Sequence, residues 1–153
     1  MSLIGVISDT HGMLRPEAVQ ALRGAELLLH AGDIGAPEVI AGLRALAPVT
    51  AVRGNGDRDA WAEAYPLRQE VTVGGVTILV LHDRKELQSL PPREGVRVVI
   101  SGHSHKASIE EKDGVLYLNP GSAGPRRFKL PLTVALLTVE GAQVSAEIVE
   151  LSR

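Results

Sequence analysis

Two histidines separated by one residue, His103 and His105, follow an apolar run in the second half of the chain. Residues 98–101 predict a buried strand, and Gly102 lets the backbone turn sharply directly after it. Open α/β sheets bind their ligands at the carboxyl ends of their strands. Two neutral imidazoles this close together indicate a metal site. The alternative interpretation is a polar turn that happens to contain two histidines.

Five further side chains with metal-binding atoms follow other apolar runs: Asp9, His11, Asp33, Asn55 and His82. The chain has no cysteine, so a metal site must use nitrogen and oxygen. These donors suit Mn²⁺, Fe²⁺, Co²⁺, Ni²⁺ or Zn²⁺ better than Ca²⁺. Seven ligands are too many for one ion but suit two ions that share a carboxylate. Any one of these residues could be a simple turn residue, but four of the five histidines fall at predicted strand ends.

The first third of the chain predicts the parallel strands that would bring these side chains together. Apolar runs at residues 3–8, 27–31 and 49–52 have strand length. Between them, helical patterns begin at Pro16 and at Pro37, because proline is tolerated in the first turn of a helix. Strand–helix–strand connections are right-handed and make the strands parallel.

The later part of the chain predicts three hairpins. Their strands are residues 70–73 with 76–81, 107–112 with 115–119, and 133–140 with 143–149, around Gly74-Gly75, Asp113-Gly114 and Gly141. We expect these hairpins to build a second sheet packed on the first. The predicted fold is an α/β layered sandwich of two mixed β-sheets flanked by helices, in one domain that spans residues 1–153.

Composition excludes several classes of partner. The chain has 153 residues, 44% of them hydrophobic, and a net charge of −2, so it offers no polycationic surface for nucleic acid. No apolar run approaches the roughly 18 residues that a membrane helix needs. No signal peptide is visible, so we expect a cytoplasmic protein without a membrane partner.

The ordered set of motifs resembles the calcineurin-like metallophosphoesterases, and most closely the small bacterial and archaeal phosphodiesterases of the YfcE type. The motifs are Asp9-x-His11, Gly32-Asp33, Gly54-Asn55-x-Asp57, His82 and Gly102-His103-Ser104-His105. Residues 119–122, Asn-Pro-Gly-Ser, are similar to a further signature of that group. The resemblance covers essentially the whole chain.

The resemblance implies a binuclear metal centre that hydrolyses a phosphodiester. Asp9, His11 and His105 would hold one ion, Asn55, His82 and His103 would hold the other, and Asp33 would bridge the pair. Asp33, Asn55 and His82 are accordingly expected to be catalytic. The expected cofactors are two divalent cations, Mn²⁺ first, with Fe, Co, Ni or Zn as alternatives. A hydroxide between the ions would attack phosphorus in line.

The sequence departs from the broader superfamily at two positions. Many members have a histidine where this chain has Gly56, and that histidine is thought to help protonate the leaving group. Glycine cannot donate a proton, so the source of that proton is open. Relatives often have glycine where this chain has Asp83. The spacing from Asp83 to Glu86 favours a helix cap over a metal ligand.

Several other residues have two interpretations. His30 is favoured as a core residue or as a support for the ligands over a ligand itself. Asp57 is favoured as a residue that fixes its own loop over one that binds a ligand. Arg126 and Arg127 could grip a phosphate or could simply be solvated. Trp61 and Tyr65 are favoured as core packing over a substrate platform.

The predicted function is therefore metal-dependent hydrolysis of a phosphodiester substrate. The alternatives are a phosphomonoesterase or nucleotidase with the same metals, and a non-catalytic interaction scaffold, since the family also contains a retromer subunit that works as a binding module. A scaffold is free to lose ligands, whereas all seven positions here carry competent side chains. The sequence does not identify the natural substrate, and it is compatible with a homo-oligomer.

Overall fold

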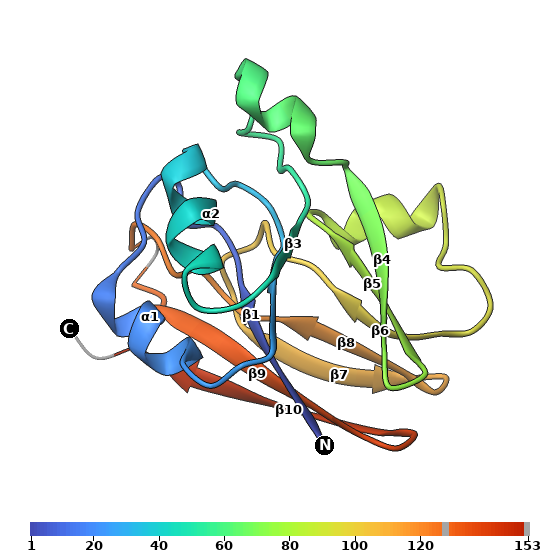
Figure 1. Cartoon of the computed structure of the whole chain (residues 1–153). Coiled ribbons are helices and arrows are strands. Elements are labelled where there is room, and N and C mark those ends of the chain that lie inside the picture. The colour runs from blue at the N-terminus through green and yellow to red at the C-terminus, as the bar shows by residue number, and fades with distance from the viewer. Residues whose placement is uncertain (127–128, 152–153) are drawn as a thin grey trace.

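The computed structural model describes residues 1–126 and 129–151 and contains two five-stranded sheets (Figure 1). The first sheet has the order β10-β9-β1-β2-β3. Its strands are β1 (Ser2–Ile7), β2 (Leu27–His30), β3 (Val49–Ala51), β9 (Thr133–Glu140) and β10 (Gln143–Glu150). Helices α1 (Pro16–Leu22) and α2 (Pro37–Arg44) connect β1, β2 and β3, which pair in parallel. The strand–helix–strand–helix–strand prediction is confirmed.

The second sheet has the order β4-β5-β6-β8-β7. Its strands are β4 (Arg68–Val73), β5 (Val76–Leu81), β6 (Val96–Ile100), β7 (Ser108–Lys112) and β8 (Val115–Asn119). Two predicted hairpins, β4–β5 and β7–β8, are present, and β6 pairs in parallel with both β5 and β8. Two short 3₁₀ helices, η1 (Ala60–Ala64) and η2 (Arg84–Gln88), lie in the connections.

We expected the third hairpin to join the second sheet. Instead, it extends the first sheet. Strand β9 pairs antiparallel with β1, in a register that places Val6 opposite Ala135. The physical reason is that β9 is apolar on both faces. Ala135 and Leu137 face the other sheet. Val134 packs on the opposite face, in a cluster that lies beneath helices α1 and α2. Both faces of the first sheet are covered, one by the second sheet and the other by α1 and α2, so a strand that is apolar on both faces can bury both there.

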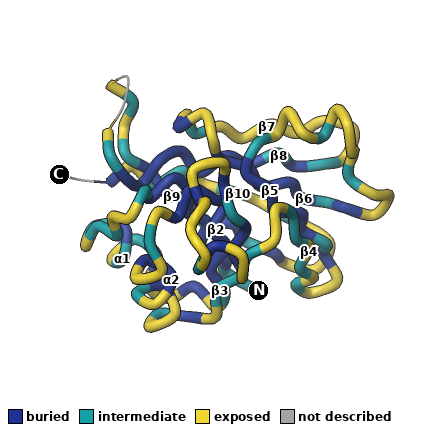
Figure 2. Tube along the Cα trace, turned by 90° about the horizontal axis from the view of Figure 1, so that it is seen from above, coloured by how far each residue is buried: buried dark blue, intermediate teal, exposed yellow. Residues whose placement is uncertain are grey.

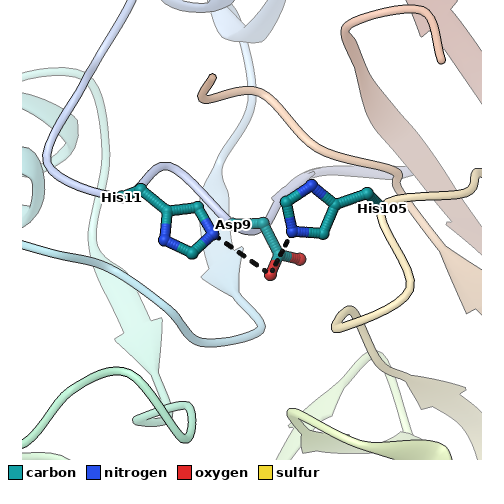
Figure 3. Close-up of side chains that lie close together, drawn as sticks. All are labelled: Asp9, His11 and His105. Carbon is teal, nitrogen blue, oxygen red and sulfur yellow. Dashed lines mark ion pairs between the residues drawn. The ribbon is translucent and has the colours of Figure 1, made fainter. Parts of the chain in front are cut away.

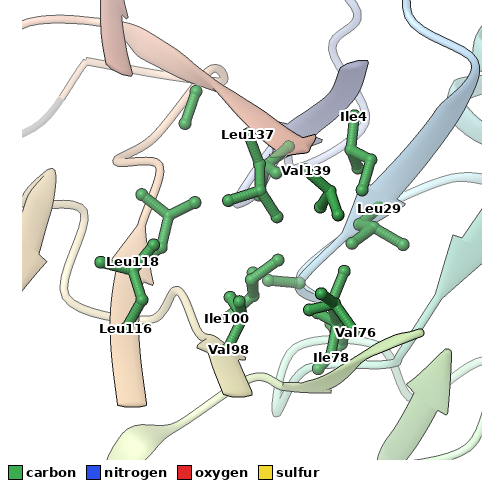
Figure 4. Packing of buried hydrophobic residues seen from close by; sticks show 14 of the residues in the cluster. Ile4, Leu29, Val76, Ile78, Val98, Ile100, Leu116, Leu118, Leu137 and Val139 are labelled. Atoms are coloured by element: carbon green, nitrogen blue, oxygen red, sulfur yellow. The ribbon is translucent and has the colours of Figure 1, made fainter. Parts of the chain in front are cut away.

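The main hydrophobic core lies between the two sheets (Figure 4). Ile4 and Leu29 of the first sheet pack in the same cluster as Ile78, Val98 and Ile100 of the second. A second cluster lies between the first sheet and helices α1 and α2. Burial of each large aliphatic side chain contributes about 1.5–3 kcal/mol, so these clusters hold the layers together. The layered α/β sandwich predicted from the sequence is confirmed.

Burial differs sharply between the strands (Figure 2). The parallel strands β1, β2 and β6 end in buried residues, whereas every residue of β7 is exposed. No helix in the described part of the chain is long and apolar enough to cross a membrane. The loops after the buried strand ends carry the candidate site.

Candidate metal centre

The loops after the parallel strands hold five of the seven predicted ligands in the left-handed region of backbone conformation. Their φ angles are 55° for Asp9, 48° for His11, 55° for Asp33, 71° for His103 and 63° for His105. Residues with a Cβ rarely adopt this conformation, because the Cβ crowds the following carbonyl oxygen. Such strain persists only where surrounding contacts enforce it, and it concentrates at functional sites.

One group of donor atoms consists of Asp9, His11 and His105, from two different loops (Figure 3). Asp9 Oδ1 lies 3.8 Å from His11 Nε2 and 3.4 Å from His105 Nε2. The two imidazole rings have their centroids 5.4 Å apart. A buried carboxylate oxygen that faces two imidazole nitrogens is a suitable donor set for a divalent transition metal.

A second group consists of Asp9, Asp33 and His82, so the two groups share Asp9. His82 Nε2 lies 3.4 Å from Asp33 Oδ2 and 3.8 Å from Asp9 Oδ1. His82 Nδ1 lies 2.8 Å from the carbonyl oxygen of Ala31, to which it can only donate. This hydrogen bond directs Nε2 towards the carboxylates. Asp33 Oδ2 also lies 3.8 Å from His11 Nε2, which links the two groups.

Three atoms at the junction of these groups are buried without a hydrogen-bond partner among the described residues: Asp9 Oδ1, His11 Nε2 and His82 Nε2. Buried polar atoms normally have a partner, and leaving one unsatisfied costs about 1–3 kcal/mol. A cation at this junction would satisfy all three at once. The residues present therefore fit a metal ion.

The arrangement of these side chains shifts the pKa values of His82 and Asp33. Burial lowers the pKa of His82, but the close contact with Asp33 and the charges of Asp9 and Asp33 outweigh it and raise the pKa to about 9. Burial raises the pKa of Asp33, but its contacts with His82 and the Gly56 N–H outweigh it and lower the pKa to about 2. Without a metal, therefore, a positive charge on His82 is favoured next to the carboxylates.

The outer oxygens of both carboxylates accept hydrogen bonds that orient them. Asp9 Oδ2 accepts hydrogen bonds from Ser8 Oγ at 2.7 Å and from the His103 backbone N–H at 3.1 Å. Asp33 Oδ1 accepts one from the Gly56 N–H at 2.9 Å. Each carboxylate therefore keeps one oxygen for the junction and uses the other for orientation.

Asp57 joins two of these loops. Its buried carboxylate accepts hydrogen bonds from the N–H groups of Ile34, Gly35 and Gly54 at 2.9–3.0 Å. The prediction that Asp57 fixes its loop is confirmed, and it also fixes the loop that carries Asp33.

Comparison with known proteins identifies the family of this chain. Residues 2–142 match the sequence model described as "Calcineurin-like phosphoesterase superfamily domain". A "Probable metallophosphoesterase" of Methanothermobacter thermautotrophicus is 39% identical, over 96% of this chain and 91% of the relative. The chain belongs to the calcineurin-like phosphoesterase superfamily.

Two solved structures illustrate the fold of this superfamily. Chaetomium thermophilum Vps29 superposes with a TM-score of 0.79 at 22% identity, over 99% of this chain and 97% of that chain. An archaeal protein described as a novel phosphodiesterase superposes with a TM-score of 0.78 at 25% identity, over 96% of this chain and 99% of that chain.

Two further residues are predicted as ligands by the superfamily resemblance, Asn55 and His103. His103 belongs to neither group of histidine and carboxylate donors, and Asn55 offers an amide oxygen instead. Asn55 is exposed, between Gly54 and the Gly56 that contacts Asp33. The His103 side chain is 44% exposed, and its Nε2 lies 3.8 Å from Asp83 Oδ2. Its ring meets that of His82 edge-on, with centroids 5.2 Å apart. Their roles as ligands remain predictions.

Two supporting residues have no assigned role in the sequence analysis. Ser122 Oγ donates to the Asp9 carbonyl oxygen at 3.1 Å. Asn119 Nδ2 donates to the Gly102 carbonyl oxygen at 3.0 Å and to Ser104 Oγ at 3.1 Å, and so braces the loop that carries His103 and His105. Both belong to the 119–122 motif, which resembles a signature of the superfamily. That motif was the sequence signal that could have identified them as supporting residues.

His30 supports the site from within the core, as predicted. It is fully buried, and its Nδ1 accepts a hydrogen bond from the Gly32 N–H at 3.1 Å. Its Nε2 therefore carries the proton and donates to Thr10 Oγ1 at 3.0 Å, and Thr10 donates onward to the Ile34 carbonyl oxygen. Burial lowers the pKa of His30 to about 3, which keeps the ring neutral, as this pattern requires.

The remaining predicted residues take structural positions. Asp83 caps η2 by accepting a hydrogen bond from the Lys85 N–H at 3.0 Å. Trp61 and Tyr65 meet edge-on, with ring centroids 6.2 Å apart, and both pack against the cluster beneath the helices, which confirms core packing. Arg126 is exposed, and Arg127 lies outside the described residues.

Two substitutions at His103 together measure the strain of its left-handed backbone. At φ 71°, alanine keeps the unfavourable Cβ and glycine removes it. We expect metal-free His103→Gly to be more stable to unfolding than His103→Ala by about 1 kcal/mol, despite the greater chain entropy of glycine. Urea denaturation measures the difference. A glycine variant less stable than the alanine variant would show that the strain is negligible.

Proposed function

We propose that this protein is a metal-dependent phosphodiesterase. The observation that carries the proposal is the buried, unsatisfied Asp9 Oδ1, which faces the Nε2 atoms of His11, His82 and His105 at 3.4–3.8 Å. Membership of the superfamily and the similarity to the archaeal phosphodiesterase support it.

The proposed ligands of one cation are Asp9, His11 and His105. Those of the other are Asn55, His82 and His103, and the proposed bridge is Asp33. Divalent cations at these positions, Mn²⁺ in the first instance, would supply an activated water and neutralise negative charge on a phosphoryl group.

The residues of the chain itself set the charge that a substrate meets. None of the described arginines and lysines forms an ion pair with Asp9 or Asp33. Without metal, two carboxylates would repel a phosphate, so substrate binding requires the cations. A phosphodiester carries one negative charge and a phosphomonoester carries up to two, so the diester needs less compensating charge. We therefore expect diesters to be preferred.

The test compares two substrates with the same leaving group, bis(p-nitrophenyl) phosphate and p-nitrophenyl phosphate, using protein loaded with Mn²⁺. We expect kcat/KM to be at least about tenfold higher for the diester, and hydrolysis to stop on chelation. A preference for the monoester would favour the phosphomonoesterase alternative. No hydrolysis of either ester with Mn²⁺, Fe²⁺, Co²⁺, Ni²⁺ or Zn²⁺ would favour a non-catalytic role.

Leaving-group protonation provides a separate test at Gly56. Its backbone is not in the left-handed region, and an added Cβ would lie 3.2 Å from Asp33 Oδ1, so a side chain fits with a small adjustment. In the native protein we expect the rate to fall steeply as leaving-group pKa rises. The variant Gly56→His should accelerate cleavage of alkyl esters, because a general acid contributes about 10²–10⁴-fold, and should leave p-nitrophenyl esters little changed.

A Brønsted series of aryl and alkyl phosphodiesters measures both slopes. Equal slopes for the native protein and for Gly56→His, with the same metal content, would mean that position 56 cannot supply the leaving-group proton.

A further inference from the structure

A groove of about 710 Å³ opens beside the proposed metal centre and extends away from it. Ser101, Gly102 and His103 form its inner end, η2 forms one wall, and residues of β7 and β8 form the other. Asp9, Asp33 and His82 do not line it. Pockets of about 300–1,000 Å³ accommodate organic ligands of drug size, so the groove can hold far more than a phosphoryl group.

The walls of the groove are tied together by Arg84. Its guanidinium forms an ion pair with Glu110 of β7 at 2.8 Å and lies over the ring of Tyr117 of β8, 4.2 Å from the centroid. Asp83 caps the same short helix. An exposed arginine ordinarily pays side-chain entropy to hold one geometry, but here two contacts fix it to two strands. Arg84 therefore links η2 to both strands of the opposite wall.

The charged side chains that line the groove are mixed: Arg84, Lys85 and Lys112 are basic, and Asp83 and Asp113 are acidic. Arg84 is neutralised by Glu110, whereas Lys85 of η2 and Lys112 of β7 form no ion pair within the described chain. Asp83 faces His103 at the inner end, and Asp113 follows Lys112 in the hairpin turn. With Arg84 paired, two lysines and two aspartates remain in the lining, and the lysines, one on each wall, are the groups that can contact a negatively charged ligand.

The rest of the lining suits the organic part of such a ligand. Leu87 and Tyr117 provide apolar surface, and Ser104 and Ser108 provide hydroxyl groups. Sites for organic ligands typically combine apolar walls with a few polar groups of this kind.

We propose that this groove binds the arm of the phosphodiester that remains on phosphorus, and that Lys85 and Lys112 select an arm bearing a second phosphate. This inference rests on the proposed function, because the reacting phosphoryl group must lie at the metal centre for one arm to run past His103. The substrate class is then a phosphodiester whose retained alcohol is itself phosphorylated.

Two esters that differ only in this second phosphate test the inference: p-nitrophenyl thymidine 5′-phosphate and its 3′-phosphorylated derivative. With Mn²⁺-loaded native protein, kcat/KM should be at least about tenfold higher for the phosphorylated ester. In the double variant Lys85→Ala/Lys112→Ala this ratio should fall to about one. The matched control is Arg23→Ala/Arg44→Ala, which removes two positive charges outside the groove and should keep the native ratio.

A native ratio near one, or a ratio that both double variants lower equally, would overturn the groove assignment. If neither ester is cleaved, the proposed function fails, and calorimetry with thymidine 3′,5′-bisphosphate and thymidine 5′-phosphate then decides the groove separately. Tighter binding of the bisphosphate by about tenfold, lost in the lysine variant, supports the assignment. Equal affinities overturn it.

Discussion

Asp33→Asn is expected to lower kcat for bis(p-nitrophenyl) phosphate by about 10²–10³-fold or more, the cost of removing one preorganised electrostatic contact. Asp33 Oδ2 lies near both His11 and His82, and Oδ1 is held by the Gly56 N–H. Asparagine keeps the shape but loses the charge that would bridge two cations. Steady-state kinetics at saturating Mn²⁺ measures the loss, and a thermal melt checks folding.

The control for this variant is Asp59→Asn. Asp59 is an exposed carboxylate that precedes η1, and its side chain makes no capping hydrogen bond. The Asp59→Asn variant should keep the kcat of the native protein. Turnover of Asp33→Asn close to that of the control would mean that the bridging role is assigned to the wrong residue.

Gly54→Ala is expected to be a strongly disruptive single-methyl change next to Asp33. A Cβ at residue 54 would overlap both the Asp33 carboxylate and the Asp33 backbone nitrogen. Backbone atoms cannot move aside as a flexible side chain can, so the Asp33 loop must shift. We expect a loss of about 1–3 kcal/mol in the free energy of unfolding, typical of overpacking, together with loss of Mn²⁺ binding.

Gly56→Ala, two residues along the same loop, is the matched control. Its Cβ would lie 3.2 Å from the same carboxylate oxygen, so a small adjustment suffices and Mn²⁺ binding should survive. Urea denaturation and a Mn²⁺ titration compare the two variants. Equal effects on stability and Mn²⁺ affinity would mean that the close approach of Gly54 to Asp33 is unimportant.

The parallel framework was predictable because its signals are local. Apolar runs of strand length, prolines at helix starts and glycines in turns identified β1, α1, β2, α2 and β3. The placement of β9 was not predictable in this way. Its pairing with β1 joins residues more than 120 positions apart, and no local pattern specifies which free edge a hairpin occupies.

The candidate site, too, was predictable from the sequence only in part. Strand ends predicted which side chains converge, and the structure brings Asp9, His11, Asp33, His82 and His105 within a few ångströms. The three hydrogen bonds that Asp57 accepts span two loops, and the left-handed backbone at the ligand positions is a property of assembled loops. Neither can be read from residue type alone. The junction atom that both groups share belongs to Asp9, whereas the family resemblance assigns the bridge to Asp33.

The amount of Mn²⁺ bound per chain tests the central claim most directly. Isothermal titration calorimetry of metal-free protein, with elemental analysis after dialysis, should approach two equivalents for the native chain, as a two-metal centre requires. Asp9→Asn should bind less, because the unsatisfied Oδ1 belongs to both donor groups. Saturation at one equivalent would contradict the binuclear centre. No binding, or binding that Asp9→Asn leaves unchanged, would contradict a metal site at this junction.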